Sequence, residues 1–165
     1  MQLAIQESIP DVQTLVDWYI EELAELLDGK IQMFDWRNGE HKHFLYAIIE
    51  LESNIVHNKN IDLDTFDLLM RLKLEKRFPK RIFIYVFDWK RSVAFLNIHH
   101  AWKKLQRQFG EFTRNDYMIV IATSFFARGE QISKILSRDN IYLVTTSEIL
   151  SMFRMKRIWI GGGVR

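Results

Sequence analysis

Two acidic residues follow an apolar run and are separated by a single leucine. Glu50 and Glu52 come after bulky, mostly uncharged residues that begin at Phe44. Such a run is typical of a strand buried on both faces, and residues two apart in a strand point to the same side. Two carboxylates on one face cost free energy to bury unless a cation compensates them. The pair therefore indicates a divalent metal site, unless the strand ends here and both side chains reach water, as the turn-like Ser53 and Asn54 also allow.

A second group with the residue types of a hydrolytic site follows another buried run. Residues 81–87 (RIFIYVF) are β-branched or aromatic, which predicts a buried strand, and Asp88 and Lys90 come directly after it. The apolar positions of residues 66–74 alternate, so this segment can be a strand instead of a helix. A hairpin between the two runs would then set Asp67 opposite Asp88. Lys90 would stabilise the negative charge that develops during a reaction.

The acidic pair lies in the second arm of a predicted hairpin. A helix over residues 11–27 comes first, with an apolar stripe along one side and Asp28-Gly29 at its end. Residues 30–37 and 40–52 are strand-like and are joined by Asn38-Gly39, the strongest short hairpin signal. We therefore expect a helix followed by two antiparallel strands in this half of the chain.

The second half alternates helical and strand-like segments. This alternation predicts parallel pairing, so the whole chain is expected to form an α/β domain with a mixed central sheet flanked by helices. Residues 1–155 would form one domain and residues 156–165 a basic C-terminal tail. The expected strands are 81–87, 117–123 and 141–145, and the expected helices are 64–78, 92–109, 127–137 and 148–155.

Composition limits the class of protein. The chain has 165 residues, of which 48% are hydrophobic, enough for one domain with a proper core. Its net charge is only +2, but Lys and Arg concentrate in residues 71–107 and 154–165, which could make one face basic. There are no cysteines, which excludes disulfides and thiolate metal sites. No apolar run is long enough to span a membrane and no signal peptide is visible, so we expect a cytoplasmic protein.

The order of elements and the Glu50-Leu51-Glu52 motif resemble the PD-(D/E)xK nuclease superfamily, which has the restriction-endonuclease-like fold. Members have a helix, an antiparallel hairpin with an acidic residue on one strand and Glu-x-Lys on the next, and then further helices and strands. In this chain Glu52 would stand at the lysine position, as in some type II restriction enzymes. The alternative register, with Asp67, Asp88 and Lys90 as the site, resembles the closing half of Mrr-type restriction nucleases.

The resemblance implies a metal-dependent DNA endonuclease. Asp35 and Glu50 would hold Mg²⁺ or Mn²⁺, and Glu52 would orient or deprotonate the attacking water. Asp28 is the substitute for Asp35, because a two-residue turn at Asn38-Gly39 would leave Asp35 far from Glu50. Cleavage of both DNA strands requires two active sites, so a homodimer is expected.

Two other functions remain open. The chain could be a nucleic-acid-binding or assembly protein on a nuclease-like or Rossmann-like scaffold that has no active metal site. It could instead bind a nucleotide through residues 123–128, at the end of a buried strand. For nucleic acid, the candidate phosphate contacts are Arg91, Lys103, Lys104 and Arg107, which are otherwise the solvated face of a helix.

Overall fold

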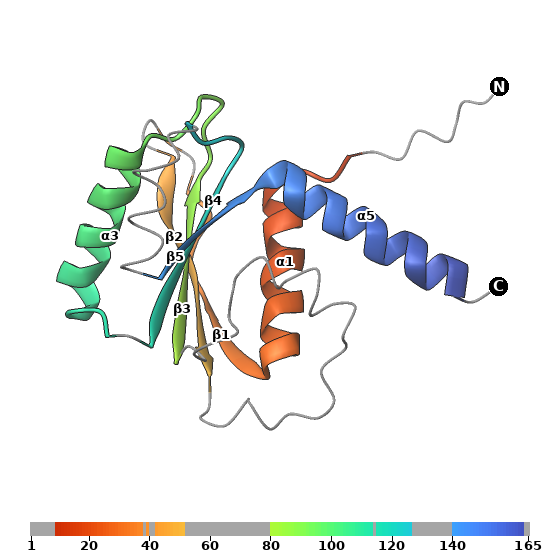
Figure 1. Cartoon of the computed structure of the whole chain (residues 1–165), viewed down its shortest axis with the longest axis horizontal. Helices are drawn as coiled ribbons and strands as arrows, with labels where there is room; N and C mark the ends of the chain where they lie inside the picture. The colour runs from red at the N-terminus through yellow and green to blue at the C-terminus, as the bar shows by residue number, and fades with distance from the viewer. Residues whose placement is uncertain are drawn as a thin grey trace.

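The computed structural model describes residues 9–37, 39, 42–51, 80–113, 115–126 and 140–163, with side chains as far as residue 155. The described elements run as one helix, three strands, one helix, two strands and a last helix (Figure 1). None of the described helices is long and apolar enough to cross a bilayer. The elements in chain order are α1 (Val12–Leu27), β1 (Gly29–Met33), β2 (His43–Leu51), β3 (Arg81–Phe87), α3 (Phe95–Phe109), β4 (Asp116–Ala122), β5 (Ile141–Thr145) and α5 (Thr146–Gly163).

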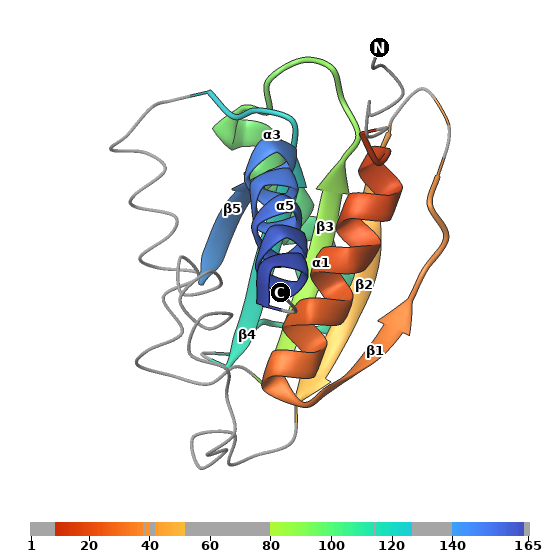
Figure 2. The same cartoon turned by 90° about the vertical axis from the view of Figure 1, so that its right-hand side faces the viewer.

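The five described strands form one mixed sheet in the order β1-β2-β3-β4-β5. β2 is antiparallel to both β1 and β3, and β4 is parallel to both β3 and β5. β1 and β5 are the two outer strands (Figure 2). The predicted α/β class, the antiparallel hairpin and the parallel second half are therefore confirmed.

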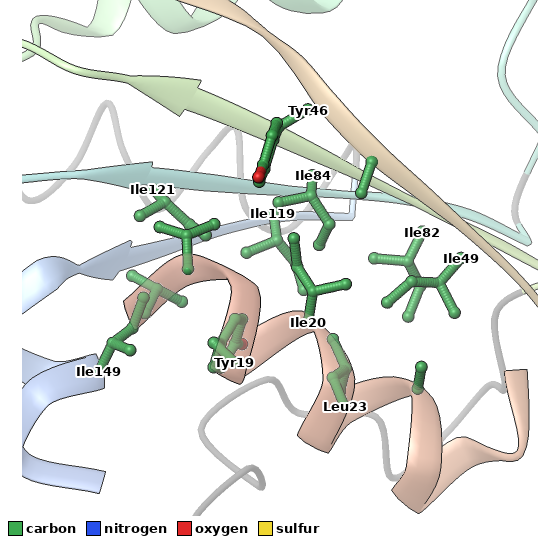
Figure 3. Close-up of a cluster of buried hydrophobic side chains, with 14 of the residues drawn as sticks. Tyr19, Ile20, Leu23, Tyr46, Ile49, Ile82, Ile84, Ile119, Ile121 and Ile149 are labelled. Carbon is green, nitrogen blue, oxygen red and sulfur yellow. The ribbon is translucent and has the colours of Figure 1, made fainter. Parts of the chain in front are cut away.

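Helices cover both faces of the sheet. α1 and α5 pack on one face and α3 packs on the other (Figure 1). Figure 3 shows side chains of α1 such as Ile20 and Leu23 packed against isoleucines of the strands, with Ile149 of α5 beside them. Nearly every residue of β3 and β4 is buried, on both faces of the sheet. This explains why these strands are apolar at nearly every position instead of alternating between apolar and polar residues.

α1 begins and ends at aspartates. The Asp11 carboxylate accepts a hydrogen bond from the Thr14 backbone N–H at 2.8 Å, which satisfies a donor that the helix itself leaves free. At the other end Asp28 has the left-handed conformation, with φ 53°, and Gly29 already belongs to β1. Glycine is the residue that most often takes the left-handed position at the end of a helix. An aspartate can take it because its short polar side chain tolerates positive φ.

Gly29 is required by close packing of β1 against β2. A Cβ atom at this position would lie 2.5 Å from Ile49 Cγ2 and 2.6 Å from Leu51 Cδ2. We expect Gly29→Ala to lower the free energy of unfolding by about 1–3 kcal/mol, because these buried side chains must shift to make room. Urea denaturation measures the change. Gly39→Ala is the matched control, since no atom lies within 4 Å of its added Cβ, and equal stabilities of the two variants would contradict the prediction.

The connection between β1 and β2 is longer than the predicted two-residue turn. β1 ends at Met33 and β2 begins at His43. The reason is Trp36, whose ring makes edge contacts with Phe44 (5.1 Å between centroids) and Tyr46 (4.9 Å). These contacts hold Trp36 against β2, so the local preference of Asn38-Gly39 for a two-residue turn does not decide the connection. Asn38 itself lies outside the described residues.

The last helix is longer than the sequence predicted. α5 starts directly after β5, at Thr146, and continues to Gly163, whereas we expected a helix over residues 148–155 and a separate tail over 156–165. No proline or glycine interrupts residues 146–160, so nothing in this stretch ends the helix. The predicted helices over residues 64–78 and 127–137 lie outside the described part of the chain.

Candidate functional site

Glu50 belongs to a row of charged residues that crosses the sheet where β3 and β4 begin. Its Cα partners are Lys30 on β1 and Arg81 on β3, and Arg81 pairs in turn with Asp116 on β4. The Arg81 pKa is raised, first by its hydrogen bond to Asp116 and to a smaller extent by the charge of Glu50. The exposed Glu50 side chain thus lies between two cationic positions, which offset its charge without a metal ion.

The register keeps Asp35 away from Glu50. Asp35 lies in the connection after β1, next to Phe34, whose N–H donates to the Tyr46 carbonyl at 2.8 Å. Asp35 therefore lies beside the part of β2 that is four or five residues before Glu50. The distance between the two residues along the strand is roughly 15 Å. Two ligands of one Mg²⁺ lie within about 4 Å of each other. One ion cannot bridge Asp35 and Glu50.

Asp28 does not take the place of Asp35 opposite Glu50 either. It lies at the same end of the hairpin, but the residue that faces Glu50 is Lys30. Asp28 precedes Gly29, whose partner is Leu51. Glu52 lies outside the described residues. The expected metal site on this hairpin is thus not assembled by the carboxylates whose positions are described.

Asp116 is a buried acid that the sequence did not single out. Its side chain is 3% exposed and accepts hydrogen bonds from Arg81 Nε (2.9 Å) and Nη2 (3.2 Å) and from the Thr113 backbone N–H (2.9 Å). Burial alone would raise the Asp116 pKa, but the hydrogen bonds and the Arg81 charge together hold it below its usual value. Asp116 therefore ties the beginnings of β3 and β4 to the loop after α3, and its role is structural.

The alternative prediction, a hairpin that pairs residues 66–74 with β3, is wrong. β3 uses one edge for β2 and the other for β4 along its whole length, so no edge is left for the third strand that would carry Asp67, a residue outside the described part of the chain. The neighbour of Asp88 is Lys42, whose carbonyl accepts the Asp88 N–H at 2.7 Å. Asp88 and Lys90 nevertheless follow β3 directly, as predicted, with Asp88 half-buried and Lys90 exposed.

Aromatic rings fill the sheet edge beside Asp88. The Arg91 guanidinium lies over the Trp89 ring, 4.1 Å from its centroid, and Trp89 contacts Phe87 at 4.9 Å. His43 stacks on Phe87, and its Nδ1 is 2.6 Å from the Tyr85 hydroxyl. Burial raises the pKa of Tyr85 to about 12, so this hydroxyl keeps its proton at neutral pH. Since Trp89 packs with the core on the α3 side, it holds Arg91 on that side of the sheet.

The loop after β4 contacts the segment between β3 and α3 at this edge of the sheet. The Ser92 and Ser124 hydroxyls are 2.7 Å apart, and Val93 pairs with Phe125 as an extension of the parallel sheet. α3 consequently begins at Phe95 and not at residue 92, as the sequence predicted. Of the segment proposed for nucleotide binding, residues 123–126 are described, and only Thr123 and Phe126 in it are exposed.

α3 carries positive charge on its solvent side. Its residues Ile98, Ala101 and Leu105 are buried against the sheet, whereas Lys103, Lys104 and Arg107 are exposed. No aspartate or glutamate occurs between Trp89 and Gly110, a stretch with five Lys or Arg residues. No acid in this segment offsets these cations; we call the exposed Lys103, Lys104 and Arg107, together with Arg91 before the first turn of α3, the α3 basic face.

The three described helices begin at the same edge of the sheet. α3 and α5 follow the carboxyl ends of β3 and β5, and α1 ends beside the start of β1, so its first turn lies at this edge too (Figure 1). Helix N-termini carry partial positive charge. Two of them already have acidic partners, because Asp11 caps α1 and Glu148 accepts from the Thr145 N–H at 3.1 Å.

A hydrogen bond between side chains of α1 and β2 was also not predicted from the sequence. The Tyr46 hydroxyl donates to the Asp17 carboxylate at 2.5 Å, and Gln13 lies 3.4 Å from the same hydroxyl. Burial, followed by the hydrogen bond to Asp17, raises the pKa of Tyr46 to about 12. Neither residue stands out in the sequence, because the contact joins a helix and a strand far apart along the chain.

Comparisons with family models, curated proteins and solved structures gave no match. In the described part of the chain no three His, Asp or Glu side chains are grouped closely enough to hold a metal ion. Mg²⁺ often keeps several waters and uses one or two carboxylates together with substrate phosphates. Asp88 at the edge of the sheet fits that minimal requirement.

Proposed function

We propose that this protein binds DNA through the α3 basic face and hydrolyses phosphodiester bonds at the sheet edge where Asp88 and Lys90 lie. One observation carries the proposal: an Asp-x-Lys sequence directly follows β3, beside the start of β2, and continues into a segment with four further cations and no acid. A carboxylate, a lysine and a phosphate-binding surface are the groups that metal-assisted phosphodiester hydrolysis requires.

Each residue has a distinct role in this proposal. Asp88 would hold a divalent ion, Mg²⁺ or Mn²⁺, which when bound stabilises negative charge on the scissile phosphate. Lys90, exposed two residues further on, would place a positive charge where the leaving oxygen becomes negative. Arg91, held against Trp89, is pre-oriented to contact a neighbouring phosphate.

The order of elements also supports a nuclease-like domain. α1, the antiparallel strands β1, β2 and β3, then α3 and the parallel strand β4 follow the order named above for the PD-(D/E)xK superfamily. In this arrangement the Asp-x-Lys motif comes directly after β3, not on the Glu50 hairpin. Two such sites would be needed to cut a duplex, so we expect a homodimer, and we place the cysteine-free chain in the cytoplasm.

One observation favours a second function, DNA binding without hydrolysis. In the described part of the chain, Asp88 does not belong to a group of three or more His, Asp or Glu side chains that could hold a metal ion. A protein that binds a phosphate backbone needs the basic face but no metal, and a nuclease-like fold does not by itself confer activity.

Cleavage and binding assays on the same preparation separate the two functions. Supercoiled plasmid and a short duplex are incubated with Mg²⁺, with Mn²⁺ and with EDTA. Metal-dependent nicking that EDTA abolishes supports hydrolysis. Binding of the duplex without nicking under any condition supports the second function, and absence of both binding and nicking contradicts both.

The α3 basic face makes a separate prediction about salt. We expect Lys103→Ala/Lys104→Ala to weaken duplex binding about tenfold and to reduce the slope of log Kd against log salt concentration by about 2, because each lost phosphate contact releases about one counterion fewer. Fluorescence anisotropy between 50 and 200 mM salt, a range in which such contacts dominate the affinity, measures both quantities.

The matched control removes the same charge from other surfaces. Lys80 and Arg154 are both exposed: Arg154 lies on α5, which packs on the other face of the sheet from α3, and Lys80 precedes β3 at the sheet edge opposite Asp88. Lys80→Ala/Arg154→Ala should leave the slope unchanged. An equal decrease in both double variants would mean that net charge, and not the α3 basic face, determines binding.

A further inference from the structure

β1 is an outer strand with an exposed apolar side. Among the described strands β2 is its only neighbour, and Ile31 and Met33 are 38% and 46% exposed. Figure 2 shows β1 at the rim of the sheet. Unpaired backbone groups next to apolar side chains are a template for pairing with another strand. We propose that β1 pairs antiparallel with β1 of a second copy of this chain, with the twofold axis at Ile31.

The hydrogen-bond pattern of β1 selects this register. The Phe34 N–H points to β2, where it reaches the Tyr46 carbonyl, so by alternation Gln32 and Lys30 also bond to β2. Gly29, Ile31 and Met33 therefore direct their N–H and C=O groups outward. A centre at Ile31 pairs all three of these residues, whereas a centre at Lys30 or Gln32 pairs only two of them within β1.

Side chains are complementary in that register. Ile31 would meet Ile31 of the partner subunit, and Met33 would lie opposite Gly29, which has no side chain to obstruct it. On the other face Lys30 would lie opposite Gln32, so no like charges meet. A lysine in an outer strand often prevents pairing, but Glu50 is the cross-strand neighbour of Lys30 in its own sheet and offsets its charge.

The proposal specifies how the homodimer of the proposed function would form, and it rests on that function only for the expectation that a dimer exists. The paired segment is short, so the interface is small and the dimer is expected to be weak and concentration-dependent. Its test uses no DNA, which keeps its outcome independent of hydrolysis.

Single-cysteine variants of the full chain test the register, because the chain has no cysteine of its own. Residues at a hydrogen-bonded antiparallel pair have Cα atoms about 5.5 Å apart, which is the distance expected between the two Ile31 residues. The two Met33 residues would be roughly 13 Å apart. A short bismaleimide should link Ile31→Cys into covalent dimers in high yield and leave Met33→Cys mostly monomeric.

Analytical ultracentrifugation tests the dimer without cysteines. We expect Ile31→Lys to raise the dimer dissociation constant at least about tenfold, since it replaces an apolar contact by two like charges. Leu96→Lys, an equally large change at an exposed leucine of α3, is the control and should not alter it. A wild type that is monomeric at every concentration, or a dimer that persists in Ile31→Lys without cross-linking in Ile31→Cys, would overturn the proposal.

Discussion

Asp88→Asn is expected to reduce the rate of metal-dependent DNA cleavage at least about a hundredfold. The substitution removes the charge that would hold the ion while keeping the size of the side chain, and losing a metal-ion interaction costs several kcal/mol in the transition state. The side chain is half-buried just after β3, and the Lys42 carbonyl, just before β2, accepts a hydrogen bond from the Asp88 backbone N–H. Folding should be little affected. Rates of plasmid nicking, with circular dichroism as the check on folding, measure the effect.

Glu50→Gln makes the same chemical change at the other end of the sheet. Because Glu50 lies between Lys30 and Arg81, we expect its cleavage rate to stay within about twofold of the wild type. A large loss of activity in Glu50→Gln together with normal activity in Asp88→Asn would move the site back to the β1–β2 hairpin. Unchanged duplex binding in Asp88→Asn would show that binding and hydrolysis use different residues.

Asp116→Ala is expected to lower the free energy of unfolding by about 3 kcal/mol. The variant leaves Arg81 and the Thr113 N–H without their partner, and removing one member of a buried ion pair is strongly destabilising. The estimate takes the lower end of the usual range because the Arg81 side chain is 31% exposed and can be rehydrated. Urea denaturation at pH 7 measures the change.

Replacing both members of the pair provides the control. Arg81→Met/Asp116→Leu removes both charges and substitutes apolar side chains of similar length, which leaves no unpaired buried charge. We expect this double variant to be more stable than Asp116→Ala. If it is equally unstable, the cost lies in packing at this position and not in the ion pair.

The same carboxylate makes stability depend on pH. The Asp116 pKa is lowered in the folded protein, so the unfolded chain takes up a proton first as the pH falls. Its contribution is complete above the unfolded pKa of about 3.9 and is lost as the pH decreases through the folded value. Denaturation curves from pH 7 to pH 2.5 should therefore show a smaller acid-induced loss in Asp116→Ala than in the wild type.

The core strands were predictable because their signal is local. Residues 81–87 and 141–145 have the predicted bounds of β3 and β5, since continuous β-branched and aromatic runs are stable only where both faces are buried. The apolar stripe of α1 is equally local and equally well predicted. Parallel pairing in the second half followed from the alternation of elements, which requires a crossover between neighbouring strands.

The candidate site was less predictable because it depends on which strands are neighbours. Glu50 and Glu52 stand out as a motif, yet the register gives Glu50 two cationic neighbours that are 20 and 31 positions away in the chain. Asp88 and Lys90 were recognised from their position after a buried run, but their predicted partner strand was wrong because β2 and β4 occupy both edges of β3. The ion pair of Arg81 with Asp116 had no sequence signal.

The amino-acid sequence by itself determined the fold class, the core strands, the first helix and the absence of acid along the α3 segment, because each depends on residues close together in the chain. Only the tertiary structure decided which charges meet. The burial of Trp36 lengthened the β1–β2 connection, and the register of β1 placed Lys30 beside Glu50. Both result from contacts between segments that are distant in the chain. A local sequence pattern does not reveal the free energies of such contacts.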